Sequence, residues 1–156
     1  MSLTPSAILW VRESVPRETH RKQCELIARL DTLEREKVIQ SLEVRTWSQS
    51  VFESTSWIDE EVSHAIDQLR DFTEATEIER IHGFETNSTA TVDGETIQRT
   101  QLPVLCLALY TEDVLQFVAP CTIGNSIMSV PDLITRLEEG KDYEEMRSVI
   151  YAGSLD

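Results

Sequence analysis

The most apolar stretch of the chain, residues 102–121, limits the possible folds more than any other part of the sequence. It reads LPVLCLALYTEDVLQFVAPC, which predicts two β-strands joined at residues 111–113. Successive side chains of a strand point to opposite faces, and the first strand is apolar on both. Both faces must therefore be covered, one of them by helices of the same chain. The other face is either interior as well or, if the chain leaves it open, a dimer surface.

The turn at residues 111–113 leaves the pairing of these two strands open. A three-residue loop places Phe117 on the face of Leu107 and Leu109, whereas a two- or four-residue loop places it beside Ala108. The turn contains neither Gly nor Asn, the residues that would select one loop type.

The rest of the chain alternates between strand and helix patterns. Residues 7–12 (AILWVR) and 42–47 (LEVRTW) have strand patterns, and residues 16–37 between them have helical spacing. This order predicts a βαβ-type unit or its antiparallel, split version. Ser56 and Asp59 resemble a capping box before a second amphipathic helix over residues 57–75. A short helix is expected to start at Ser129 with Asp132, and to end at Gly140.

Residues 78–86 and 89–101 are expected to be extended, with a hairpin turn at Asp93-Gly94. The second segment is polar, so the hairpin should lie at a sheet edge or protrude. From these patterns we predict a single α+β domain over residues 1–140 and an acidic C-terminal tail over residues 141–156. The expected architecture is a mixed or mostly antiparallel sheet with two long helices packed on one face, ferredoxin-like.

Charge gives the clearest indication of habitat. Acidic residues outnumber basic ones 28 to 14, for a net charge of −14, and only three basic residues are lysines: Lys22, Lys37 and Lys141. This composition is typical of salt-loving archaea, because molar salt shortens the Debye length to about 3 Å and mutes self-repulsion. An ordinary acidic protein of a mesophile is the alternative. The charge disfavours nucleic acid as a partner without excluding it, and Arg12, Arg17 and Arg21 are the candidate phosphate contacts.

The sequence carries no recognisable reaction centre. It lacks zinc-ligand pairs, glycine-rich phosphate loops and serine-nucleophile motifs, so we expect no metal, no cofactor and no enzyme activity. Neither a signal peptide nor a membrane span is expected, and three cysteines, an odd number, indicate reduced thiols and a cytoplasmic protein. Cys121 is the best candidate for a thiol nucleophile, since it stands at a strand end beside polar residues.

The order VRESVP, a helix, EVRTWSQSV, a second helix, and LPVLCLALYTEDVLQFVAPCTIGNSIMSVPDLITRLEE resembles a family of small haloarchaeal proteins. These proteins are labelled helix-turn-helix domain proteins or uncharacterised. The likeness spans residues 8–139, and VRTW at residues 44–47 is among its most specific parts. The resemblance implies a regulatory role and supplies no catalytic residues.

We therefore hypothesise a non-enzymatic regulatory or protein-interaction module of a halophilic archaeon, working as a homodimer or with another protein partner. The residues expected at the association surface are Trp47, Val104, Tyr110 and Phe117. One alternative is a DNA-binding transcription regulator. The other is a small-molecule-binding protein or thiol-dependent enzyme that uses Cys121.

Overall fold

The computed structural model describes residues 4–52, 59–76, 78–124 and 126–140. The Ser56 cap and the acidic tail predicted over residues 141–156 lie outside this part of the chain. A four-stranded sheet forms its centre, in the order β2 (Leu42–Trp47), β1 (Ser6–Arg12), β7 (Leu105–Thr111), β8 (Val114–Ala119). β1 and β2 are parallel, and the other neighbours are antiparallel, so the fold is α+β with a mixed sheet, as predicted.

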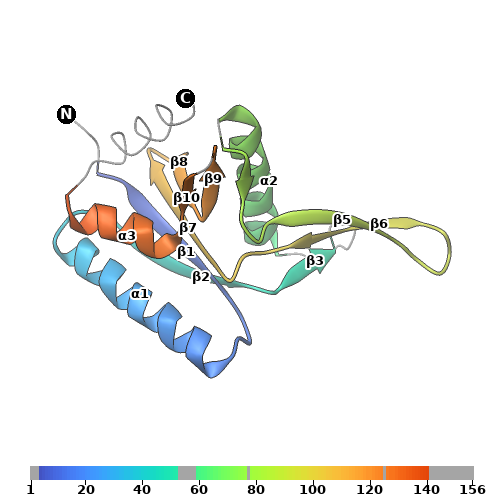
Figure 1. Cartoon of the computed structure of the whole chain (residues 1–156), viewed down its shortest axis with the longest axis horizontal. Coiled ribbons are helices and arrows are strands. Elements are labelled where there is room, and N and C mark those ends of the chain that lie inside the picture. The colour runs from blue at the N-terminus through green and yellow to red at the C-terminus, as the bar shows by residue number, and fades with distance from the viewer. Residues whose placement is uncertain (1–3, 53–58, 77, 125, 141–156) are drawn as a thin grey trace.

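The expected placement of the helices is wrong. α1 (Arg17–Arg35) and α3 (Val130–Glu138) lie together on one side of the sheet, whereas α2 (Glu60–Ala75) lies on the other (Figure 1). Ser6, Ile8 and Trp10 alternate along β1 and share a cavity with side chains of α2. The intervening residues Ala7 and Leu9 point to the opposite face and are buried there. With both faces of β7 apolar, each face has its own helical cover.

The topology also differs from the expected ferredoxin-like arrangement. A split βαβ unit places an antiparallel strand between its two parallel strands. Here Ala7 to Arg12 of β1 pair directly with Leu42 to Trp47 of β2, and α1 makes the crossover between them. The antiparallel neighbour β7 instead pairs with the other edge of β1. The sequence pattern is compatible with either unit, because both have the same order of elements along the chain.

The β7–β8 hairpin has a two-residue loop, but its strands pair in the register expected from the sequence for a three-residue loop. Thr111 pairs with Val114, so Glu112 and Asp113 form a two-residue loop, and both have positive φ (52° and 66°). A β-bulge then shifts the register, so that Leu109 pairs with Phe117. Phe117 therefore lies on the leucine face after all, because the bulge adds one residue to β8.

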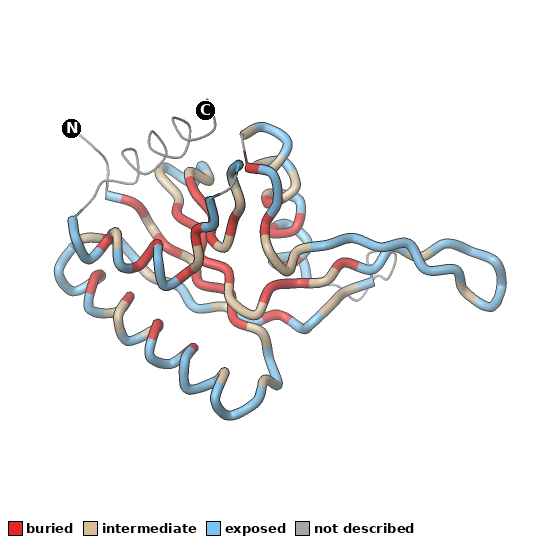
Figure 2. Tube along the Cα trace, in the orientation of Figure 1, coloured by how far each residue is buried: buried red, intermediate tan, exposed pale blue. Residues whose placement is uncertain are grey.

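Two small sheets complete the fold. β4 (Arg80–Ile81), β9 (Cys121–Ile123) and β10 (Ser126–Met128) form one of them, in the order β10-β9-β4. The other has the order β3-β6-β5, from β3 (Ser50–Phe52), β5 (Glu85–Ala90) and β6 (Thr96–Gln101). The β5–β6 hairpin extends away from the rest of the molecule, and its exposed residues dominate that region of Figure 2. This agrees with the expected protruding hairpin, and Gly94 takes positive φ (85°) in its turn.

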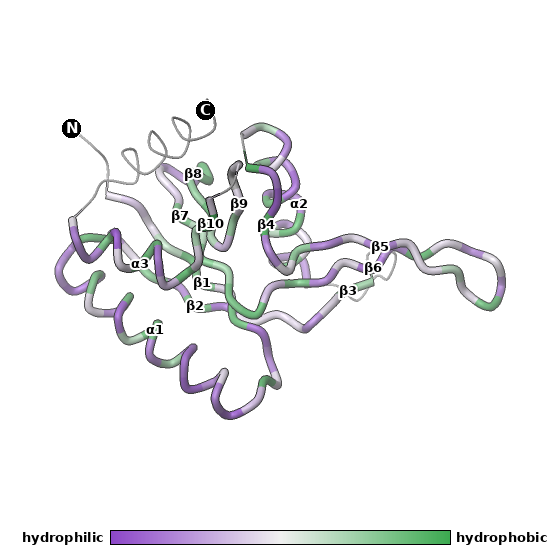
Figure 3. The backbone as a smooth tube through the Cα atoms, viewed as in Figure 1, coloured by the Kyte–Doolittle hydropathy of each residue, from purple (hydrophilic) through white to green (hydrophobic). Residues whose placement is uncertain are grey.

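Local sequence signals set the ends of the helices. Asp59 caps α2 by accepting a hydrogen bond from the backbone N–H of Glu61 at 2.8 Å. Ser129 and Asp132 form the predicted capping box of α3, and Gly140, with φ 77°, follows its C-terminal cap residue. Figure 3 shows hydrophobic residues along the central strands and hydrophilic ones along the outer side of α1.

Candidate functional site

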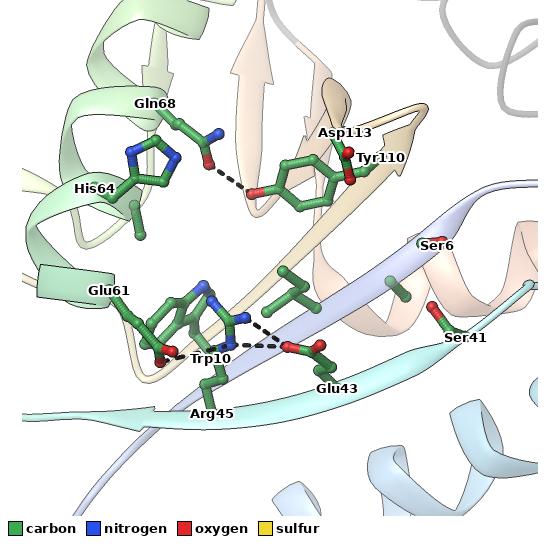
Figure 4. A pocket seen from close by; sticks show the side chains of 13 residues that line it. Ser6, Trp10, Ser41, Glu43, Arg45, Glu61, His64, Gln68, Tyr110 and Asp113 are labelled. Atoms are coloured by element: carbon green, nitrogen blue, oxygen red, sulfur yellow. Dashed lines mark hydrogen bonds and ion pairs between the residues drawn. The ribbon is translucent and has the colours of Figure 1, made fainter.

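Two features of the surface can carry function: a groove beside α2 and the protruding β5–β6 hairpin. The groove, called here the α2 groove, lies between the N-terminal half of α2 and the sheet face formed by β1, β2 and β7 (Figure 4). Its volume is about 410 Å³, which falls within the range of small-molecule sites. The residues that define it are Ile8, Trp10, Arg45, Glu61, Gln68 and Tyr110.

Stacked aromatic rings form one end of the groove. Trp10 and Trp47 lie with their ring centroids 4.7 Å apart and their planes 13° from parallel. The indole N–H of Trp47 donates to the backbone oxygen of Pro103 at 2.8 Å, which fixes the buried ring. The guanidinium of Arg45 lies over the Trp10 ring, 5.7 Å from its centroid, within the range of cation–π attraction.

Carboxylates hold Arg45 in this position. Its guanidinium lies 2.6 Å from a carboxylate oxygen of Glu43 on the same strand and 3.9 Å from one of Glu61 on α2. Arg45 and Trp10 are register partners in the parallel pair of β1 and β2, so their side chains share the face below α2. The charged group therefore connects the sheet with the first turn of the helix (Figure 4).

Tyr110 forms the other end of the groove. Its hydroxyl donates a hydrogen bond to Oε1 of Gln68 on α2 at 2.8 Å. Burial, followed by the nearby thiol of Cys106, raises the pKa of Tyr110 to about 12, although Arg45 acts in the opposite direction. The hydroxyl is therefore neutral at physiological pH. Since its hydrogen is directed to Gln68, its oxygen can accept a further hydrogen bond from the groove.

The β5–β6 hairpin, called here the arm, is held at its base by hydrogen bonds to α2, and its β5 strand is exposed to solvent. At the base, Arg70 of α2 donates to the hydroxyls of Thr86 at 2.7 Å and Thr100 at 3.0 Å. Among the described residues, β3 pairs with β6 only as far out as Arg99, and the arm is two-stranded beyond that residue. Every residue of β5 is exposed, and β5 is an edge strand of its sheet.

The four residues expected at an association surface lie in different environments. Trp47 and Phe117 are fully buried within this chain, with 1% and 2% of their surface exposed. Val104 is half-buried, and Tyr110 is half-buried in the α2 groove. The structure thus assigns Trp47 and Phe117 to the core, because the bulge and the tryptophan stack turn both side chains inward.

The three arginines predicted as phosphate contacts also lie in different environments. The Arg12 guanidinium turns inward and donates to the backbone oxygen of Leu102. Its Nε is buried and has no hydrogen-bond partner among the described residues. Arg17 and Arg21 are exposed on the first turns of α1. Arg12 is therefore a structural residue, whereas the other two arginines remain accessible to a partner.

Cys121 does not have the properties of a nucleophile. It is 1% exposed, and burial raises its pKa to about 12, so the thiolate is scarce at neutral pH. Sequence reasoning missed a different pair, in which Sγ of the exposed Cys24 lies 3.5 Å from Nε2 of His20. The spacing His-x-x-x-Cys on a helix is the signal that could have revealed it, since residues i and i+4 are neighbours.

The groove itself was also missed. Its lining alternates along two strands and repeats along α2, so no local motif marks it; only the packing of α2 against the sheet brings Arg45, Glu61 and Tyr110 together. Among the described residues, no three His, Cys, Asp or Glu side chains are grouped to hold a metal ion. None of the helices in the described ranges combines the length and hydrophobicity needed to cross a membrane.

Comparison with known proteins gives one match. No curated protein and no solved structure matches the chain. A family described as "Helix-turn-helix domain" matches residues 3–142, nearly the whole sequence. In the described part of the chain, two strands stand between α1 and α2 and seven between α2 and α3, so no two of these helices are joined by the short turn of that motif. The match nevertheless covers far more than half of the sequence, and the chain belongs to this helix-turn-helix domain family.

Proposed function

We propose that this chain is a non-enzymatic regulatory protein that works as a homodimer and joins its partner copy through the arm. The arm is the observation that carries this proposal. A two-stranded ribbon alone is at best marginally stable in water, and within the described part of the chain no third strand pairs with residues 87–98. A partner along the arm supplies the missing contacts.

The open edge of β5 has the chemistry expected of a contact between two acidic molecules. Residues 86–92 contain no charged side chain, although 27% of the chain is charged and a seven-residue segment would carry about two charges on average. Edge strands of monomers are usually protected by charges, prolines or bulges. Two copies with a net charge of −14 each repel one another, and an uncharged strand edge is where they approach at least cost.

The symmetric arrangement pairs β5 with β5 of the second copy, antiparallel, about a twofold axis. The three-stranded sheets β3-β6-β5 of the two copies then form one continuous sheet. This places association on a surface that the sequence marked only as polar, while Trp47 and Phe117 stay in the core of each copy.

A shortened arm tests the proposal. Asn87 and Arg99 are register partners, so replacing residues 88–98 with Asn-Gly closes a two-residue hairpin while leaving the anchored base intact. We expect light scattering after size exclusion to give twice 17.8 kDa for the natural chain and 17.8 kDa for the shortened one, with unchanged circular dichroism. A natural chain that is monomeric across protein and salt concentrations would overturn the proposal.

A point variant provides the matched control. Ser88 on β5 and Gln98 on β6 are register partners, so lysine at either position adds the same charge to the same part of the arm. Only S88K places it on the edge that we assign to the second copy. We expect S88K to be monomeric and Q98K to remain dimeric. Equal behaviour of the two variants would contradict pairing through β5.

A second candidate function, binding of DNA by a transcription regulator, is favoured by the description of the family. Arg17 and Arg21 are exposed near the start of α1 and are its candidate contacts. A gel shift with genomic fragments over a range of KCl concentrations tests it. The R17A/R21A variant should weaken binding and reduce the salt slope by about one per lost phosphate contact, whereas R35A/K37A, at the other end of α1, should not. Absence of any shift at low salt would exclude this function.

We also place the protein in the cytoplasm of a halophilic archaeon. The excess of 28 acidic over 14 basic residues and the eleven arginines among the latter support this habitat. Added KCl should raise the unfolding temperature strongly, because it screens repulsion among the carboxylates. A protein equally stable at low and molar KCl would contradict the proposed habitat.

A further inference from the structure

We infer that the α2 groove binds a linear polyamine, a flexible chain with an ammonium group at each end. The inference is independent of the proposed dimer, since the groove is built by α2 and the central sheet and none of its lining belongs to the arm. It starts from the charges that line the cavity.

Charge in the groove favours a cation. Its lining contains three carboxylates, those of Glu43, Glu61 and Asp113, against one arginine, Arg45, and one histidine, His64. Glu43 neutralises Arg45 through the 2.6 Å ion pair, which leaves Glu61 and Asp113 as the excess negative charge. An anionic ligand would meet this excess together with the net charge of −14 of the whole chain.

The hydrogen-bonding groups point to a ligand rich in N–H donors. The carboxylates accept hydrogen bonds, and the oxygen of Tyr110 is left as an acceptor because its hydrogen is donated to Gln68. Ser6 and Ser41 add hydroxyls that can also accept. The pKa of Tyr110, raised to about 12 by burial, keeps that hydroxyl neutral.

The groove already shows how it accommodates a cation. Arg45 lies over the π face of Trp10, with carboxylates of Glu43 and Glu61 beside it. An ammonium group that binds beside Arg45 lies near the carboxylate of Glu61. Glu61 is a weak partner of Arg45 at 3.9 Å and is 65% exposed, so it is available to a ligand.

The length of the groove selects a long, unbranched cation. Figure 4 shows Glu61 and Arg45 at one end and Ser6, Tyr110 and Asp113 toward the other. Ser6, Ile8 and Trp10 follow one another along the same face of β1, with the apolar Ile8 in the middle. Trp10 is four positions along the strand from Ser6, a span of about 13 Å. A methylene chain over Ile8 therefore joins two ammonium groups, one near each end carboxylate.

Calorimetric titration with spermidine, 1,4-diaminobutane and butylamine at one KCl concentration tests the inference. We expect spermidine to bind most tightly, since it alone reaches both ends, and butylamine to bind most weakly. Adipate, a dianion with a similar methylene chain, should not bind. Amide N–H signals around Ile8, Arg45 and Tyr110 should shift in NMR spectra on titration with spermidine.

Variants that each remove one carboxylate distinguish binding in the groove from general attraction between a polycation and an acidic protein. E61Q and D113N each remove a carboxylate of the groove, whereas E60Q and E112Q remove the neighbouring exposed carboxylates, which do not line it. We expect E61Q and D113N each to weaken spermidine binding roughly threefold to fivefold, as for exposed charge pairs, and the other two to have no effect. Equal losses in all four variants, no preference for the longer amine, or no binding would each overturn the inference.

Discussion

Lys37, at the end of α1, adopts a backbone conformation that glycine usually provides. Its φ is 62°, its N–H donates to the oxygen of Glu34 at 3.1 Å, and the N–H of Val38 donates to Leu33 at 2.9 Å. These two bonds form a Schellman motif with a lysine at its left-handed position. The side chain costs free energy there because Cβ crowds the backbone.

Replacement of this residue gives a prediction at the residue scale. K37G should raise the free energy of unfolding by about 1 kcal/mol, since glycine adopts positive φ without crowding. K37A removes the same charge but retains Cβ, so it should not stabilise the protein. Urea denaturation of the two variants at equal KCl measures the difference, and identical midpoints would contradict the account.

The hairpin turn at Glu112 and Asp113 shows what sequence reasoning could and could not resolve. The two strands and their apolar faces followed from the pattern of side chains, and the structure confirms them. The loop length did not follow, because the turn has no Gly or Asn and Glu112 is not a residue that usually takes positive φ in such a loop. The bulge beside Leu109 has no signal in the local sequence, and it alone decides the side of Phe117.

At the scale of elements, α2 connects the two candidate surfaces. It lines the groove through Glu61 and Gln68, and Arg70, two residues beyond Gln68, anchors the base of the arm. The sequence predicted this helix and its apolar stripe correctly. It could not predict on which face of the sheet the helix packs, because both faces of β7 are apolar. The groove forms only where α2 packs on the sheet, so it could not be predicted from the sequence.

The anchor at Arg70 gives a prediction at the element scale. R70M keeps the aliphatic stem but removes the charged donor to Thr86 and to the buried Thr100. We expect the free energy of unfolding to fall by about 1–2 kcal/mol, and amide hydrogen exchange to accelerate along β5 and β6.

The control for this variant is R80M, which removes a surface ion pair with Glu85 at 3.3 Å whose side chains are 55% and 54% exposed. It should change stability by less than about 0.5 kcal/mol. If R70M were as stable as R80M, the anchoring role of Arg70 would have to be abandoned.

At the scale of the whole molecule, two buried thiols and the half-buried phenol of Tyr110 make the stability depend on pH at high pH. Burial raises the pKa of Cys106, Cys121 and Tyr110 to about 12, from ordinary values of 9.0, 9.0 and 10.0. In the unfolded chain these groups lose their protons first, so the unfolded state binds fewer protons above pH 9. The stability that the neutral groups contribute is complete below the unfolded pKa values and is lost as the pH rises toward 12.

We therefore expect the free energy of unfolding to fall between pH 9 and pH 11, by up to about 1.4 kcal/mol per pH unit for each group. C121S removes one of the three groups and should flatten the curve, whereas C24S, at an exposed thiol, should leave it unchanged. Denaturant titrations across this range measure the slope. The same slope for C121S and the natural chain would count against the explanation.

The position of β1 in the central sheet has a consequence for synthesis on the ribosome. β1 is the first strand of the described chain, yet it lies inside the sheet, with β2 on one edge and β7 on the other. The unit from β1 to β2 can form early. The second edge of β1 can pair only after Leu105 to Tyr110 have been synthesised, much later. During that interval the nascent chain exposes an apolar strand whose backbone N–H and C=O groups on one edge have no hydrogen-bond partners. A chaperone that shields β1 until β7 leaves the exit tunnel would therefore raise the yield of native protein.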